Sequence, residues 1–347
     1  MYKELLNILV DPTSKAALRL EVHQVESEEI LAGGLHDASG HPYPIVRGIP
    51  RFVLTHDQGQ LQTSSSFGFK WQQIWKHDSP ESNDLVRDWL VQRYGFKDPQ
   101  EMSDYFNRHQ FILDAGCGNG LSSSQWLTPE NKATWVGADI SVAVDVAQER
   151  LSRIPSTHFV QADLLQLPFR DQTFDTIFSE GVLHHTPSTE QALKALVPLL
   201  KPGGEFLFYV YRQKGPIREF TDDYIRQIVS PLPPEKALEL LRPLTLLGQA
   251  LAELKVEVEV PEDIPYLSIK AGRYDVQRLI YWHFAKMYWN DKLSFEKNEF
   301  VNFDWYHPRY AHRQTEAEVK RWCAEAGLSI THFDTQESGF TVRATRS

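Results

Sequence analysis

Short apolar runs alternate with segments of helical periodicity between residues 111 and 211. The runs have the length and apolar character of buried strands, and the segments between them carry apolar residues at helical spacing. This alternation is typical of a parallel sheet covered by helices, because a parallel strand is reached through a crossover connection. We therefore predict a doubly wound α/β core that begins near Tyr105.

The expected elements continue in a second segment near the C-terminus. The alternation of strand and helix patterns stops at about residue 212 and resumes at 313. The stretch between is helical and rich in aromatic residues, and we interpret it as a cap inserted late in the α/β domain. The predicted strands are 111–113, 134–138, 158–161, 174–179, 205–211, 328–333 and 340–345, and the predicted helices are 121–127, 142–153, 189–200 and 315–326.

The N-terminal third has a different pattern. Residues 1–55 contain short apolar runs separated by turn formers, which predicts a small β-rich domain. A polar connector is expected at 56–66 and helices at 67–107. The predicted domains are therefore 1–55, 56–104 (connector, helices and lid), 105–211 with 313–347 (α/β core), and 212–312 (cap).

Composition restricts the class of protein. The 347 residues include 46 acidic and 36 basic side chains, a net charge of −10 that disfavours a large nucleic-acid interface. No secretory signal and no membrane-spanning run is evident. Two cysteines, Cys117 and Cys323, are too few for a disulfide framework or an all-cysteine zinc site. We expect a cytoplasmic protein without a membrane partner, and a homo-oligomer is compatible with the sequence.

A glycine-rich turn follows the first core strand and precedes a helix. It reads Asp114-Ala115-Gly116-Cys117-Gly118-Asn119-Gly120. Glycine accepts positive φ and lets a ligand approach the backbone, although such turns also serve helix–strand packing. A dinucleotide enzyme usually shows G-x-G-x-x-G; here the third glycine comes one position earlier, and Asp114 would repel a phosphate but suits a cationic amino acid moiety.

Acidic side chains recur at the ends of the following strands. Asp139 ends the second strand, where a carboxylate can accept the hydroxyls of a ribose. Asp163 and Leu164 end the third, suited to an adenine amino group and ring, and the fourth ends in a run containing Glu180 and His185. The carboxyl ends of parallel strands form the ligand-binding edge of an open sheet, so these positions together predict a nucleoside site.

These segments resemble the class I S-adenosylmethionine-dependent methyltransferase domain, in particular the ubiquinone/menaquinone-biosynthesis type. The similarity covers residues 105–211 and 313–347 and rests on the runs LDAGCGNG, VGADIS, QADLLQLPF, FDTIFSEGVLHHT and LKPGGEF. It implies a seven-stranded Rossmann-like sheet with an antiparallel last strand. It also implies that the glycine turn runs alongside the methionine moiety of the donor, that Asp139 holds the ribose, and that Asp163 with Leu164 flanks the adenine. The expected donor-binding residues are Asp114, Gly116, Gly118, Asn119, Gly120, Asp139, Ile140, Asp163, Leu164, Glu180 and His185.

The N-terminal region is similar to a small zinc-ribbon-like domain found beside some methyltransferases. The matching runs are LLNILVDPTSKAALRL and YPIVRGIPRFV. Asp11-Pro12 stands where that family has Cys-Pro, and no cysteine occurs in the first hundred residues. We expect the zinc site to be lost and the domain to have a structural or contact role.

Aromatic residues suggest a lid and an acceptor pocket. Phe69 and Trp71 either cover the sulfonium, which benefits from aromatic faces, or pack a helix on the sheet. In the cap, His307 or His312 is the candidate base, and Tyr306 or Tyr310 is expected to position the acceptor. The two histidines lie five residues apart, but no third ligand is evident, so no metal is expected.

The sequence thus predicts methyl transfer from S-adenosylmethionine to a small-molecule acceptor through an O, N or C nucleophile. Such a displacement needs mainly alignment and exclusion of water. Two alternatives stay open: a tRNA or protein methyltransferase, and a non-catalytic scaffold that keeps the fold.

Overall fold

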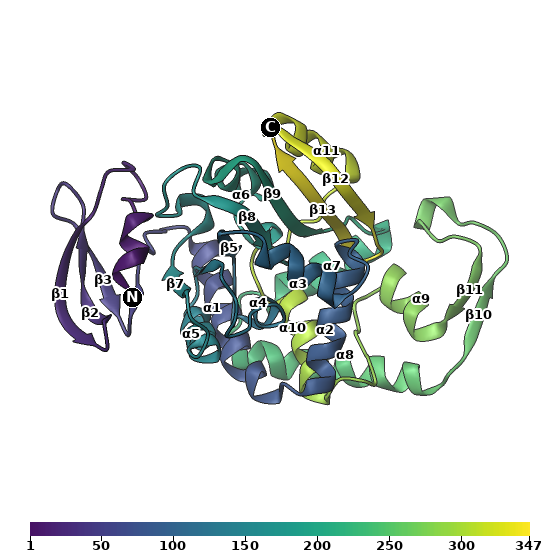
Figure 1. The fold of residues 1–347 in the computed structure, drawn as a ribbon. Coiled ribbons are helices and arrows are strands. Elements are labelled where there is room, and N and C mark those ends of the chain that lie inside the picture. The colour runs from purple at the N-terminus through teal and green to yellow at the C-terminus, as the bar shows by residue number, and fades with distance from the viewer.

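The computed structural model describes all 347 residues and centres on a seven-stranded sheet (Figure 1). The strand order is β12-β13-β9-β8-β5-β6-β7. The four pairings among β5 to β9 are parallel, whereas β13 is antiparallel to both β9 and β12. The predicted doubly wound fold is confirmed. The strands are β5 (Phe111–Ala115), β6 (Thr134–Asp139), β7 (Thr157–Gln161), β8 (Phe174–Ser179), β9 (Leu200–Tyr211), β12 (Leu328–Thr335) and β13 (Gly339–Arg346).

The strand order places a ligand edge at β5. The chain moves from β5 outward to β6 and β7 and then returns to the other side at β8. The connections after β5 and β8 therefore diverge, and the crevice between them is where open parallel sheets bind ligands. The core helices are α4 (Leu121–Ser124), α5 (Ala143–Leu151), α6 (Thr189–Leu196) and α11 (Glu316–Glu325).

Three core elements differ from the prediction. The helix expected at 189–200 ends at Leu196 because a short 3-10 turn containing Pro198 follows and Leu200 already pairs with Phe174 of β8. Strand β9 consequently starts five residues before its expected position. The β8–β9 pairing shifts register between Phe174 and Thr176, and this irregularity accommodates the Pro202-Gly203-Gly204 segment. The helix expected at 121–127 is a single turn.

The N-terminal region forms a separate lobe beside β7 (Figure 1). Its four-stranded antiparallel sheet comprises β1 (Arg19–Glu26), β2 (Glu29–His36), β3 (Pro42–Val46) and β4 (Ile49–Pro50). Asp11 accepts hydrogen bonds from the Ser14 amide and the Tyr43 hydroxyl, at 2.6 Å each. The residue at the expected cysteine position thus ties the lobe together through hydrogen bonds.

The segment between the lobe and the core is helical from its start. It contains α1 (Gln58–Ile74), α2 (Pro80–Arg93) and α3 (Pro99–Asn107). The connector predicted at 56–66 is wrong, because Asp57 caps α1 by accepting from the Gln60 amide. Thr63 and Ser66, which suggested a loop, are buried polar contacts of this helix.

The inserted segment is a helical cap packed beside α1 and α2 (Figure 1). It contains α7 (Pro216–Val229), α8 (Pro234–Glu253), α9 (Val276–His283) and α10 (Phe295–Tyr306). A hairpin of β10 (Glu257–Val260) and β11 (Gly272–Asp275), which the sequence did not indicate, projects from it. None of the helices combines the length and apolarity needed to cross a bilayer. Short 3-10 helices complete the chain: η1 (Lys3–Asn7), η2 (Trp75–His77), η3 (Leu164–Gln166), η4 (Leu183–His185), η5 (Val197–Leu199) and η6 (Pro265–Leu267).

Candidate active site

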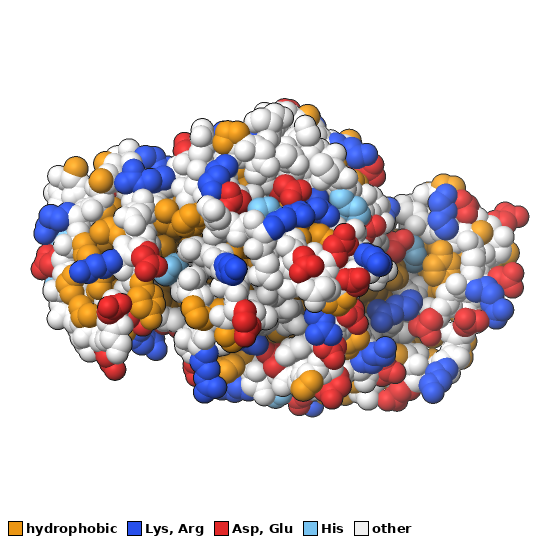
Figure 2. Space-filling model, viewed as in Figure 1, with side chains coloured by type: hydrophobic (Ala, Val, Ile, Leu, Met, Phe, Trp, Pro, Cys, Tyr) orange, Lys and Arg blue, Asp and Glu red, His pale blue; other side chains and the backbone are white.

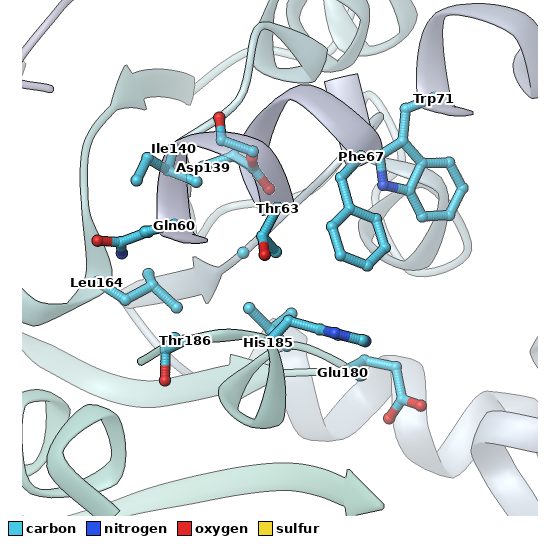
Figure 3. A pocket seen from close by; sticks show the side chains of 14 residues that line it. Gln60, Thr63, Phe67, Trp71, Asp139, Ile140, Leu164, Glu180, His185 and Thr186 are labelled. Atoms are coloured by element: carbon cyan, nitrogen blue, oxygen red, sulfur yellow. The ribbon is translucent and has the colours of Figure 1, made fainter. Parts of the chain in front are cut away.

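A pocket of about 640 Å³ lies at the carboxyl edge of the sheet, covered by α1 (Figure 3). This volume includes space that is open to solvent. The walls come from α1, from the ends of β5, β6 and β7, and from the turn after β8. The lining residues are Gln60, Thr63, Ser64, Phe67, Trp71, Gly116, Asp139, Ile140, Leu164, Glu180, Gly181, Val182, His185 and Thr186.

The glycine turn adopts the backbone conformation expected of it. Gly116, Gly118 and Gly120 have φ of 85°, 52° and 73°, a region that other residues rarely adopt. A Cβ at Gly116 would lie 2.3 Å from a Val182 methyl, and one at Gly118 would lie 2.9 Å from the Trp71 indole nitrogen. The turn is thus packed closely against two residues that line the pocket.

A Gly116→Ala variant is expected to lower the free energy of unfolding by at least about 1–2 kcal/mol. The positive φ strains any L residue, and the new methyl must displace Val182. Urea denaturation measures the change. A matched Gly203→Ala variant has a similar φ of 76° but open space around the new methyl, so it should show only the conformational cost.

Asp139 connects the end of β6 with the glycine turn. Its carboxylate accepts the Gly118 amide at 2.8 Å through one oxygen and the Ser141 amide at 2.8 Å and hydroxyl at 2.7 Å through the other. Ile140 and Leu164 supply apolar walls beside it (Figure 3). This combination of a held carboxylate and apolar sides is suited to a ribose and a flat base.

Asp114 lies behind the glycine turn and does not line the pocket. Its buried carboxyl accepts a hydrogen bond from the Ser123 hydroxyl. Burial raises the pKa of Asp114 to about 7, although the Ser123 hydrogen bond opposes this rise. Asn119, also outside the lining, is buried and accepts the Leu121 amide through its side chain, so it holds the start of α4.

Asp163 is shielded from the pocket by Gln60. The Gln60 amide donates to the Asp163 carboxylate at 2.8 Å, and the same oxygen accepts the Leu165 amide. Gln60 itself lines the pocket; its amide oxygen accepts from the Thr55 hydroxyl, and one N–H of its amide remains beyond the bond to Asp163. Sequence reasoning missed Gln60 because it lay in the segment interpreted as a connector.

Glu180 is buried at the pocket wall beside a fully buried arginine. Arg93 from α2 donates to one carboxylate oxygen, and the Tyr94 hydroxyl donates to the other at 2.7 Å. The guanidinium lies 3.6 Å from the ring centroids of both Trp89 and Tyr209. Burial raises the pKa of Glu180, and the charge of Arg93 opposes that effect. The sequence predicted Glu180 at the site, but nothing indicated that α2 would supply its counter-charge.

Only one of the two predicted lid aromatics lines the pocket. Trp71 and Phe67, which belongs to the same segment, project from α1 toward the cavity (Figure 3). Phe69 instead packs against Phe300 and Phe303 of the cap, with centroid distances of 6.2 and 5.8 Å. Helical spacing explains this result, since residues 67 and 71 lie one turn apart on the same face and residue 69 points elsewhere.

The four candidate catalytic residues lie outside the pocket lining and make internal contacts. His307 pairs its ring nitrogens with the Ser66 hydroxyl at 2.8 Å and the Leu232 carbonyl at 2.9 Å. The Tyr306 hydroxyl lies within hydrogen-bond distance of the Asp222 carboxylate and the Lys286 carbonyl, and its one hydrogen can be donated to either.

The other two candidates belong to the seam between the cap and α1. Tyr310 donates from its hydroxyl to Asp57, and its carbonyl contacts the ring of His185. The ring of His312 stacks on that of Tyr310, and the His312 amide donates to the His184 carbonyl. These contacts join the cap to α1 and to the turn after β8.

Comparison with known proteins agrees with this geometry. Residues 113–208 match the sequence model of a methyltransferase domain, a segment that begins in β5 and ends in β9. It contains the glycine turn and the strand-end residues Asp139, Leu164 and Glu180. This segment is therefore similar to a methyltransferase domain, and the rest of the chain lies outside the match.

Relatives match over about a third of the chain. A protein of Encephalitozoon cuniculi named as a methyltransferase is 35% identical over 32% of this chain and 49% of its own length. The phthiotriol/phenolphthiotriol dimycocerosates methyltransferase 1 of Mycobacterium ulcerans is 30% identical over 32% and 41%. The "Probable tRNA methyltransferase 9B" of Mus musculus is 34% identical over 31% and 23%. The chain thus spans less than half the length of each of these relatives.

Solved structures give a looser likeness. The magnesium protoporphyrin IX methyltransferase of Synechocystis PCC 6803 is 15% identical, with a TM-score of 0.44 over 85% of this chain and 100% of that one. A 1,6-didemethyltoxoflavin-N1-methyltransferase of Burkholderia thailandensis is 13% identical, with a TM-score of 0.43 over 94% and 99%.

Proposed function

We propose that this chain transfers the methyl group of S-adenosylmethionine to a small-molecule acceptor held between the sheet edge and the helical cap. The observation that carries the proposal is the pocket itself, where the glycine turn, Asp139, Ile140 and Leu164 meet although they come from three different strand ends. The match of residues 113–208 to a methyltransferase domain supports it.

The residues present fit such a donor. Asp139 would hold the ribose hydroxyls, Ile140 and Leu164 would contact the adenine, and Gln60 would offer its amide to the ring edge. A side chain at Gly116 would collide with Val182, so only glycine lets the turn pack against this part of the pocket wall. The donor supplies an activated methyl group on a good leaving group. The protein then needs to align the acceptor opposite the sulfur and exclude water.

Phe67, Trp71 and His185 are the side chains proposed to close the site toward the acceptor. The Phe67 and His185 rings contact edge to face at 4.7 Å. Burial lowers the pKa of His185 to about 3, so its ring is neutral at physiological pH and presents no competing positive charge to a sulfonium. In this proposal Tyr306 and His307 serve the cap architecture, and the two resemblances, to quinone-biosynthesis enzymes and to the ribbon-like N-terminal domain, remain expectations.

A tRNA acceptor is the second candidate because one relative is named as a tRNA methyltransferase. The net charge of −10 disfavours it, and acidic and basic side chains are interspersed on the face shown in Figure 2. Saturable tRNA binding with a steep salt dependence would favour this candidate over a small molecule.

Calorimetric titration with S-adenosylhomocysteine tests the donor half of the proposal. One saturable site per chain is expected, with NAD giving no heat of binding under the same conditions. Transfer of a radioactive methyl group from S-adenosylmethionine tests the acceptor half. The label is expected in an extract of small metabolites and not in tRNA or protein. A chain that binds neither nucleoside would be a scaffold rather than an enzyme.

The donor affinity should rise with pH through about 7. Asp114 has a pKa raised to about 7, so the free protein binds a proton there at lower pH. A cationic ligand favours the ionised carboxylate, so binding near neutral pH should release a proton and weaken below pH 6. Titrations in buffers of different ionisation enthalpy measure this release, and an Asp114→Asn variant should abolish it. An affinity independent of pH from 5.5 to 8.5 would contradict this role.

A further inference from the structure

Three charged side chains meet between α1 and the cap, behind the aromatic wall of the pocket. The Lys70 ammonium lies 2.7 Å from one oxygen of Asp304, and the Lys286 ammonium lies 3.8 Å from the other. Both lysines are buried, whereas the Asp304 side chain keeps 18% of its surface accessible. The Asp304 carboxylate, beside the two ammonium groups, is therefore still partly accessible.

The positive charge of Lys286 has little negative charge beside it. Its residue is 5% exposed, its ammonium donates no hydrogen bond in the structure, and its one carboxylate neighbour is already engaged by Lys70. Burial lowers the pKa of Lys286 to about 8, which leaves it mostly charged at neutral pH. A buried cation with only a distant, shared carboxylate is costly, and an additional anion beside it would lower that cost.

The surroundings add further positive charge around Trp305. Arg218 lies 5.3 Å from the Trp305 ring and pairs with Asp222 at 2.7 Å. Arg226 donates to the Trp305, Pro308 and Arg309 carbonyls and has no carboxylate partner. Four buried or nearly buried cations therefore share two carboxylates in the interior of the cap.

Aromatic rings connect this group with the pocket. The Lys70 ammonium lies 4.1 Å from the centroid of the Trp71 ring, which lines the pocket. On the other side, the Lys286 ammonium lies 4.7 Å from the Trp305 ring, which packs on Tyr211 at 4.6 Å. Tyr211 in turn contacts the pocket residue His185 at 5.3 Å. Aromatic side chains thus separate the two lysines from the proposed donor site.

We propose that Lys286, supported by Lys70 and flanked by the Trp305 ring, is an anion subsite that binds a carboxylate or phosphate of the methyl acceptor. The inference rests on the proposed function and adds the acceptor class: a molecule with a flat, apolar body and an anionic group at one end. The anion supplies the counter-charge that Lys286 lacks, and the aromatic layer holds the body toward Phe67 and His185.

Fluorine NMR titration of the full chain in the presence of S-adenosylhomocysteine tests the subsite. The probes are 4-fluorobenzoate, 4-fluorophenyl phosphate and the neutral 4-fluorobenzamide. At least one anionic probe should bind at least tenfold more tightly than the amide, and the preferred anion distinguishes carboxylate from phosphate. Equal binding of all three probes, or binding of none, would overturn the proposal.

Two substitutions locate the effect. Lys286→Met should remove the preference for the anion, and Lys286→Arg should keep it. The matched control Lys292→Met changes an exposed lysine near the same segment and should leave every affinity unchanged. An anion preference that survives in the Lys286→Met variant would place the binding elsewhere and contradict the proposal.

Thermal unfolding separates a ligand site from a structural ion pair. Without ligand, the Lys286→Met variant should unfold at the same temperature as the wild type or higher, because an uncompensated buried charge has been removed. A lower Tm would show that the ammonium is already compensated within the protein. Calorimetry with S-adenosylhomocysteine checks the donor site separately. The probe titrations are repeated without S-adenosylhomocysteine. Failure of donor binding and failure of anion binding can then be distinguished.

Discussion

An Asp139→Asn variant is expected to bind S-adenosylhomocysteine about 10- to 100-fold more weakly than the wild type. The carboxylate accepts hydrogen bonds through both oxygens, from Gly118 on one side and Ser141 on the other. An amide has only one acceptor oxygen, so its NH₂ group must face a backbone N–H and the glycine turn loses one anchor. Each hydrogen bond to a charged group contributes about 1.5–3 kcal/mol, and about 1.4 kcal/mol is tenfold in affinity.

Calorimetry measures this change directly. An Asp171→Asn variant, which alters an exposed carboxylate outside the pocket, removes the same charge and should leave the affinity unchanged. Ser141→Ala should have an intermediate effect, since it removes one hydrogen bond to Asp139 and leaves the carboxylate in place. Wild-type affinity in the Asp139→Asn variant would exclude Asp139 from the donor site.

An Arg93→Met variant is expected to lose about 3–5 kcal/mol of unfolding free energy at neutral pH. The substitution leaves Glu180, whose side chain is 9% exposed, as a carboxylate with only the Tyr94 hydroxyl to compensate it. It also removes the guanidinium from between the Trp89 and Tyr209 rings. Urea denaturation gives the free energy, and adding Glu180→Gln to the variant should recover part of the loss.

The loss should shrink as the pH falls toward 4. Burial raises the pKa of Glu180 in the folded protein, so protonation favours the folded state relative to the unfolded one. A protonated Glu180 needs no counter-charge, and the variant therefore approaches the wild type in acid. A loss below about 1 kcal/mol at pH 7, or one that does not depend on pH, would show that the ion pair contributes little.

The parts of the site that come from the α/β core were predictable from the sequence. Strand ends follow from local apolar runs, and the parallel order brings their carboxyl ends to one edge. Gly116, Asp139, Ile140, Leu164, Glu180 and His185 therefore line the pocket as expected. The sequence could not indicate that Asp114 and Asp163 would be engaged by Ser123 and Gln60, because these contacts depend on side-chain packing rather than on position along a strand.

The parts supplied by α1, α2 and the cap were harder to predict. Residues 56–66 are rich in Ser, Thr and Gln, which favour loops when exposed, but here the cap buries that face of α1. The crowded aromatic and histidine run at 303–313 suggested chemistry, whereas its side chains pair with Ser66, Asp222 and Asp57 to fasten the cap. Such long-range pairings leave no local signal in the sequence.

A crystal structure with S-adenosylhomocysteine bound is the most direct test of the central claim. We expect the adenosine between Ile140 and Leu164 and both ribose hydroxyls on the Asp139 carboxylate. The homocysteine should lie along the glycine turn, with its sulfur facing Phe67 and His185. A pocket left empty at saturating ligand, or density for a nicotinamide nucleotide in its place, would contradict the assignment of this chain as a methyltransferase.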